Sequence, residues 1–151
     1  MSRPFIATVL CAALLCAGPA SAQFQKPEDA IKYRQSAMAI QNVHLARLFA
    51  MANGRVPFDA RAAGENIELI AAINRIQFAG FVEGGDKALT RAKPEIWTEK
   101  EKWGAAAARS QDDVDRLVAA GKSGQLDQIR TAVGAVGQSC KACHDSYRAD
   151  R

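Results

Sequence analysis

Four long stretches with the apolar periodicity of an α-helix, separated by glycine and proline breaks, occupy residues 23–151. They run approximately over 27–53, 59–79, 98–120 and 125–148. No stretch alternates apolar and polar residues for long enough to predict a sheet. Four helices of about 20 residues with mostly short connections predict an all-α fold, an antiparallel four-helix bundle.

The breaks carry helix start and stop signals. Asp59 is suited to an N-cap, and Gly121 and Gly124 are expected to end the third helix. The longest connection runs over Gly80–Pro94, and long connections in compact domains are commonly functional. Gly134 and Gly137 lie inside the fourth stretch, where glycine costs helix stability. They predict that something bulky packs against the backbone there.

Residues 1–22 have the pattern of a secretory signal peptide. An apolar run over 5–17 is followed by Ala20-Ser21-Ala22, a small-residue cleavage pattern. The run is shorter than the roughly 20 residues that a membrane span needs. Cys11 and Cys16 each follow a leucine, where a lipoprotein site prefers a small residue, so we expect secretion without a lipid anchor. The predicted mature domain covers 23–151, lies in the periplasm and has no membrane anchor.

Charge gives little sign of a nucleic-acid partner. The chain has 20 basic and 16 acidic residues, a formal net charge of +4. The basic residues are spread among the acidic ones and form no run. We therefore expect no nucleic-acid binding.

The sequence C-K-A-C-H, with Cys140, Cys143 and His144, is the attachment signature of a c-type haem. Two thiols one helical turn apart can add to vinyl groups on one porphyrin edge, and the histidine that follows can ligate the iron. A redox dithiol is an alternative, although such motifs usually start a helix after a strand. A zinc site would need more ligands, and the only other histidine is His44. We favour one covalent haem c.

The second axial position of the iron decides between functions. Two strong ligands give an electron carrier, whereas an open sixth position can bind a diatomic gas. Met38 lies on the apolar stripe of the first helix, together with Ile31 and Leu45. His44 follows Met38 by six residues and is therefore rotated by about 240° from it. Met51 lies near the end of that helix, and several lysines are further candidates.

Four segments resemble the cytochromes c', over essentially the whole of 23–151. They are K-P-E-D-A-I-K-Y-R-Q-S-A-M at 26–38, E-G-G-D at 83–86, P-E-I-W at 94–97 and C-K-A-C-H-D-S-Y-R at 140–148. The resemblance implies a bacterial periplasmic haem protein, commonly a homodimer packed through its first two helices. It also implies five-coordinate high-spin iron that binds nitric oxide and carbon monoxide. Cys140 and Cys143 would hold the haem, and His144 would be its proximal ligand.

The resemblance also implies roles for residues around the haem. Arg34 and Gln35 match positions that contact a propionate, and Met38 and Phe81 match positions on the distal face. Arg148 matches a basic residue beside the proximal imidazole. We expect gas binding with one-electron transfer to unknown redox partners, and no catalytic residues. The alternative is a low-spin electron carrier with His144 and Met38 as ligands, and a haem-free interaction module is the weakest alternative.

Overall fold

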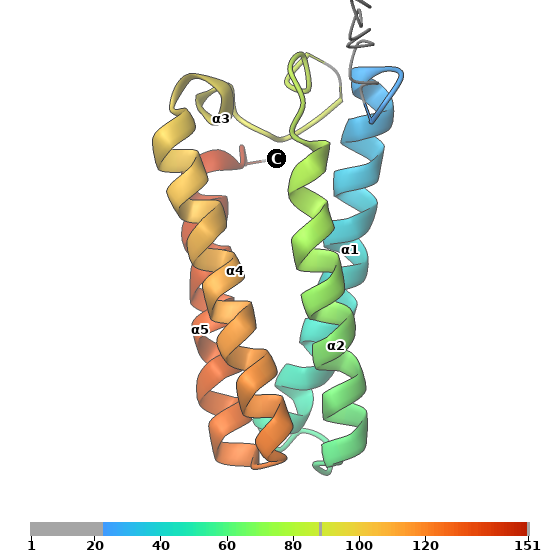
Figure 1. Cartoon of the computed structure of the whole chain (residues 1–151), viewed down its shortest axis with the longest axis vertical. Helices are drawn as coiled ribbons and strands as arrows, with labels where there is room; N and C mark the ends of the chain where they lie inside the picture. Colours follow the sequence, from blue (N-terminus) through green and yellow to red (C-terminus); the bar gives the residue numbers. More distant parts are fainter. Residues whose placement is uncertain (1–22, 88, 151) are drawn as a thin grey trace, which may run out of the picture.

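The structure is a computed structural model that describes residues 23–87 and 89–150. Its long helices are α1 (Pro27–Ala52), α2 (Ala60–Gln77), α4 (Lys100–Ser123) and α5 (Leu126–Tyr147). A 3-10 turn (Phe78–Gly80) and the one-turn helix α3 (Glu95–Thr98) lie in the connection between α2 and α4. Figure 1 shows the long helices side by side. The predicted antiparallel four-helix bundle is thus confirmed. The predicted signal peptide, 1–22, lies outside the described residues.

The helix boundaries agree with the sequence signals except at the end of α4. Asp59 caps α2 as predicted, accepting a hydrogen bond from the backbone N–H three residues later at 3.0 Å. Of the two glycines predicted to end the third helix, Gly124 does so, as the C-cap after Ser123 with a φ of 65°, whereas α4 continues through Gly121. A Cβ on Gly121 would lie 2.9 Å from Ile67 Cδ1, so this glycine lets α4 approach α2 closely.

The bundle consists of two helical hairpins, α1–α2 and α4–α5, closed by short turns at the same end (Figure 1). Phe49 of α1 packs against Gly137 of α5, where a Cβ would lie 2.8 Å from the ring. The prediction of a bulky neighbour is therefore correct for Gly137. It is wrong for Gly134, since a Cβ there would meet no described atom within 4 Å.

The aliphatic core fills the half of the bundle near these short turns. Its most buried members come from all four long helices and include Leu48, Ile70, Leu117, Ile129, Val133 and Val136. Toward the other end of the bundle the buried side chains are largely polar, namely Arg34, Gln41, Asn74, Gln77, Ser110, Asp113 and Ser139. The two halves of the interior therefore differ in chemistry. Within the described residues, no helix is both long enough and apolar enough to span a membrane.

Candidate haem site

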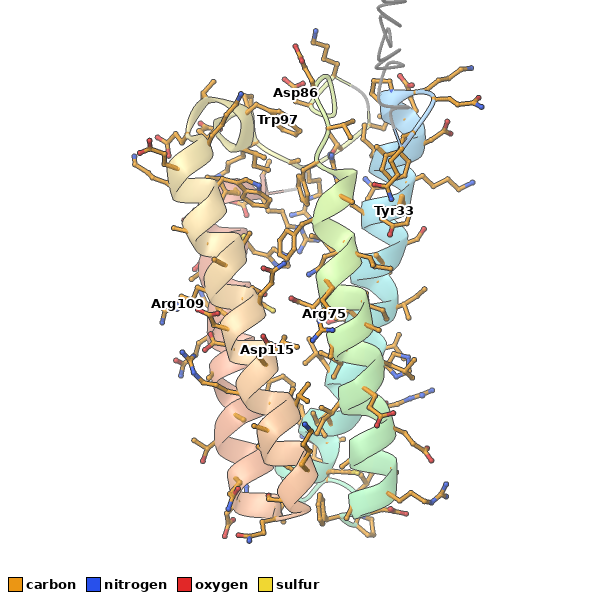
Figure 2. All side chains as sticks on the ribbon, viewed as in Figure 1. Tyr33, Arg75, Asp86, Trp97, Arg109 and Asp115 are labelled. Carbon is orange, nitrogen blue, oxygen red and sulfur yellow. The ribbon has the colours of Figure 1, made fainter. Side chains whose placement is uncertain are left out.

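The predicted site residues lie toward the end of the bundle where α1 begins and α5 ends. The connection between α2 and α4 crosses the same end (Figure 1). Figure 2 shows Asp86 and Trp97 there, on this connection. Segments that are distant in sequence thus meet around the last turns of α5.

Cys140 and Cys143 lie one turn apart on α5, half-buried and with free thiols. Burial raises the pKa of Cys140, and the nearby Asp113 carboxylate raises it further. Burial and the neighbouring Cys140 raise the pKa of Cys143 to about 11. Dithiol oxidoreductases require the opposite shift, toward a reactive thiolate. The environment of this pair therefore disfavours the redox-dithiol interpretation and keeps both thiols protonated.

His144 follows directly, in the last turn of α5. Desolvation lowers the pKa of its imidazole, and the positive charges of Arg148 and Arg91 lower it further, against the opposing effect of Asp145. The imidazole is therefore neutral at pH 7 and keeps a lone pair for a metal. In the described part of the chain, no three His, Cys, Asp or Glu side chains gather as a metal-ligand cluster. The zinc interpretation finds no support there.

An open cavity of about 340 Å³ adjoins His144. Its walls combine three cationic side chains with two carboxylates, and it is lined by Arg91, Lys93, His144, Asp145, Arg148 and Asp150. The predicted residue Arg148 is exposed beside it. The imidazole is thus accessible from a space with an excess of positive side chains.

Arg34, predicted to contact a propionate, is buried and holds the connection against α1. Its guanidinium donates to the carbonyl oxygens of Gly80 at 2.9 Å and Gly85 at 2.7 Å, and to Thr90 Oγ1 at 2.9 Å. Burial lowers the pKa of Arg34 and the Asp86 carboxylate raises it, yet an arginine stays charged in proteins. Three of its five N–H groups are used in these bonds, which leaves two for a further acceptor.

Phe81 belongs to an aromatic cluster next to Arg34. Its ring centre lies 4.6 Å from the guanidinium carbon of Arg34, 4.6 Å from the ring centre of Trp103 and 6.4 Å from that of Trp97. Trp103 in turn meets Tyr147 of α5 edge-on at 5.2 Å. The cluster therefore extends from Arg34 on α1, through Phe81 in the connection, to Tyr147 at the C-terminal end of α5.

Met38 is half-buried on α1, one turn after Arg34. The antiparallel contact between Phe49 and Gly137 fixes the register of α1 against α5. Following both helices from this contact for eleven residues brings Met38 to the level of Arg148, which follows α5 and lies one turn beyond His144.

Two other predicted candidates lie apart from this arrangement. Gln35 is exposed, and its Nε2 donates to the Leu89 carbonyl at 3.4 Å. His44 is engaged elsewhere, because its Nδ1 lies 2.8 Å from Asn66 Oδ1 between α1 and α2.

The sequence analysis marked the whole connection Gly80–Pro94 as functional but gave no role to its segment Thr90–Lys93, which we call the strap. The strap crosses the end of α5, where Ala92 pairs with Arg148 in an antiparallel bridge. The neighbouring P-E-I-W motif at 94–97 indicates a resemblance to a family but not a contact with α5. No local periodicity or spacing predicts a pairing between residues as far apart in the chain as Ala92 and Arg148.

The residues at this end fit a covalently bound haem. Two neutral thiols and a neutral imidazole lie within five positions of one helix, which is the donor set that thioether attachment and axial ligation need. Three buried side-chain atoms have no hydrogen-bond partner among the described residues: Gln41 Nε2, Asn74 Oδ1 and Gln77 Oε1. Polar atoms of this kind could form hydrogen bonds with the polar substituents of a bound haem. Among the described residues, the aliphatic half of the interior offers no such partners.

A family model described as Cytochrome C' matches residues 29–148. The chain belongs to the cytochrome c' family. The cofactor of this family is covalently bound haem c, which confirms the predicted cofactor and its attachment pair, Cys140 and Cys143.

The chain is similar to the cytochrome c' of Rubrivivax gelatinosus, with 46% identity over 127 residues, covering 83% of this chain and 98% of that protein. The crystal structure of that protein superposes with a TM-score of 0.82, covering 99% of it. Two variants of the Alcaligenes xylosoxidans cytochrome c' are also similar, each 39% identical and covering 85% of this chain and 100% of theirs. One is a nitric oxide complex with a TM-score of 0.81, and the other is a carbon monoxide complex with a TM-score of 0.80.

Proposed function

We propose that this protein is a periplasmic mono-haem cytochrome c' with high-spin, five-coordinate iron that binds nitric oxide and carbon monoxide and exchanges one electron. The observation that carries the proposal concerns the axial ligands. His144 is the histidine beside the thiol pair, and the chain's only other histidine, His44, bonds to Asn66 instead. A second imidazole is therefore not offered to the iron. The nitric oxide and carbon monoxide complexes of the Alcaligenes relatives support gas binding.

Attachment of the haem would use the two cysteine thiols in their protonated state. Each thiol would hold the haem by a thioether bond, formed by net addition of S–H across a vinyl C=C bond with sulfur on one carbon and hydrogen on the other, which would need no oxidant. The raised pKa values of Cys140 and Cys143 keep that hydrogen on sulfur. The lowered pKa of His144 leaves an imidazole nitrogen free to ligate. The bound haem supplies the iron that takes up the gas or the electron.

The remaining predicted residues would orient and enclose the group. Arg34 has two free N–H groups for a propionate oxygen, and Gln35 lies on the next position of α1. Phe81 and Met38 would close the distal face with apolar surface. Arg148 would keep positive charge beside His144. These roles are binding roles, and we propose no catalytic residue and no enzymatic turnover.

A low-spin electron carrier is the second candidate, because Met38 is half-buried and lies near the level of the C-terminal end of α5. Thioether ligation would raise the potential and close the gas site. Optical spectra of the oxidised and reduced holoprotein, with and without carbon monoxide, distinguish the two. High-spin spectra that shift with carbon monoxide are expected, whereas low-spin spectra that ignore it would refute five-coordination.

Met38→Leu keeps the apolar bulk and removes the sulfur, so it should leave the resting spin state unchanged if Met38 only shields the iron. Met51→Leu makes the same change in the aliphatic core and serves as the matched control. A change from low to high spin in Met38→Leu alone would identify Met38 as a ligand. Met38→Ala, which also removes the shield, should speed carbon monoxide binding.

We also propose that two copies pair through α1 and α2. Ile40 and Val43 on α1 and Leu69 and Ile76 on α2 are large apolar side chains that are each about half exposed. Their spacings of three and seven put each pair on one face of its helix. A second copy would cover the same surface symmetrically.

The oligomeric state is measured by light scattering after gel filtration. Val43→Glu should convert a dimer to a monomer, whereas Val56→Glu, at an equally exposed valine in the turn after α1, should not. A monomeric wild-type protein would refute the pairing. Periplasmic export is tested on the same sample, since the N-terminal sequence of the purified protein should begin at Gln23. Retention of residues 1–22 would contradict cleavage.

A further inference from the structure

The C-terminal end of α5 has no glycine to close it. The helix ends at Tyr147, and its C-cap residue Arg148 has an extended backbone, with φ −118° and ψ 125°. The last four carbonyl groups of an α-helix have no donor within the helix, and in α5 they belong to residues 144–147. The chain that follows matches the first of them, because the Arg148 amide donates to the His144 carbonyl at 3.0 Å.

A single residue from another part of the chain supplies donors for the other three. The backbone N–H of Lys93 donates to the Tyr147 carbonyl at 2.9 Å. Its ammonium nitrogen Nζ donates to the carbonyls of Ser146 at 3.1 Å and Asp145 at 3.3 Å. A positive charge at this position also interacts favourably with the negative end of the helix dipole. Lys93 thus replaces the usual local C-cap.

The strap that carries Lys93 is itself fixed at both ends. On the α5 side, the Ala149 amide donates to the Arg91 carbonyl at 2.8 Å, and Arg91 Nε donates back to the Ala149 carbonyl at 2.8 Å. On the α1 side, Arg34 donates to Thr90 Oγ1 at 2.9 Å. The cap is therefore attached to a rigid part of the bundle and can transmit its position to α5.

We propose that Lys93 is a positioning residue that fixes the last turn of α5 and thereby holds the imidazole of His144 in its ligating orientation. The inference rests on the proposed role of His144 as the iron ligand. His144 lies between two anchors: the thioether bonds of Cys140 and Cys143 precede it, and the three carbonyls bonded to Lys93 follow it. Without the Lys93 ammonium group the last turn loses two of these three bonds and frays, so His144 is held less firmly on that side.

The test replaces Lys93 with methionine, which keeps the length of the side chain and removes the ammonium group. Two properties of the holoprotein are measured: the iron–imidazole stretching band in the resonance Raman spectrum of the ferrous form, and amide hydrogen exchange at residues 147–149. We expect the band to broaden and move to lower frequency, and exchange to become roughly tenfold faster because the last turn opens locally. Lys93→Arg, which keeps the charge and the donors, should restore both.

Lys122→Met is the matched control, because it makes the same charge change on an exposed lysine in the last turn of α4, at the opposite end of the bundle. An unchanged band and unchanged exchange in Lys93→Met would overturn the proposal, as would equal changes in Lys122→Met. Should Lys93→Met yield no folded holoprotein, Arg91→Met removes one side-chain bond of the strap and leaves Lys93 in place. A smaller shift in the same direction then supports the proposal, and no shift overturns it.

The exchange measurement separates this proposal from the proposed function. If the wild-type spectrum contains no iron–imidazole band, or if His144→Ala retains it, ligation by His144 is wrong. Faster exchange in Lys93→Met would still establish Lys93 as the cap of α5. The proposal that Lys93 positions an iron ligand would then be refuted together with ligation by His144. A normal band that Lys93→Met leaves unmoved refutes the positioning role alone.

Discussion

Replacing Arg34 with methionine is expected to destabilise the protein by about 5 kcal/mol. The methionine keeps the apolar stem of the side chain but removes the donors to the buried carbonyls of Gly80 and Gly85. A buried polar group left without a partner costs about 1–3 kcal/mol, so the two together cost about 2–6 kcal/mol. Loss of the cation–π contact with Phe81, at 4.6 Å, adds about 1 kcal/mol. The total is a large part of the stability of a small domain, about 5–15 kcal/mol.

The free energy of unfolding is measured by urea denaturation of the holoprotein, followed by far-UV circular dichroism. Arg75→Met is the control: its partner Asp115 lies 3.6 Å away between α2 and α4, and both side chains are mostly exposed, 72% and 66% (Figure 2). Exposed pairs contribute little, so this variant should lose less than about 1 kcal/mol. A loss below about 1 kcal/mol in Arg34→Met as well would refute the argument from buried carbonyls.

Four further substitutions test other parts of the fold by the same denaturation assay. Gly137→Ala should lower the free energy of unfolding by about 1–3 kcal/mol, because its Cβ would lie 2.8 Å from Phe49. Gly134→Ala, with open space around it, should raise that free energy by up to about 1 kcal/mol. Equal effects of the two substitutions would contradict the packing argument. Leu48→Ala, fully buried in the aliphatic core, should cost about 2–5 kcal/mol, and a loss below about 1 kcal/mol would speak against that core. Backbone hydrogen bonds lower the pKa of Asp59, so its contribution to stability is present above the unfolded pKa of about 4 and is lost as the pH falls through the lower folded pKa. Asp59→Asn should flatten the stability profile in that acidic range, and an unchanged profile would exclude Asp59 as its source.

The four long helices could be predicted from the sequence because each carries its own periodicity and its own signals. Asp59 predicts the start of α2 from its side-chain chemistry alone. The C-K-A-C-H segment predicts a haem c from the spacing of its cysteines and histidine alone. Which of the two glycines, Gly121 or Gly124, ends α4 could not be predicted in this way. Gly121 serves a contact with Ile67 on another helix, and a glycine used for packing looks the same in sequence as one that ends a helix.

The candidate site was predictable where its residues form a local motif and not where they meet through the fold. Cys140, Cys143 and His144 are adjacent in the chain. Lys93 acts on α5 from a segment more than fifty positions away, and its role depends on which carbonyls the bundle brings within reach. Arg34 was predicted by resemblance to face the haem, but its bonds to the connection could be seen only in the folded chain.

The aliphatic core lies at one end of the bundle and the site at the other. A small rotation of the helices around the core is therefore amplified at the site. The core joins the two hairpins near their short turns, and the site lies farther along the same helices. From Val136 to Tyr147, α5 rises by about 16 Å. A rotation of one hairpin against the other by about 2° around the core would therefore move the last turn by about 0.6 Å. Substitutions that only alter how the aliphatic side chains interlock are thus a means of tuning the width of the site from a distance, without changing any residue that lines it.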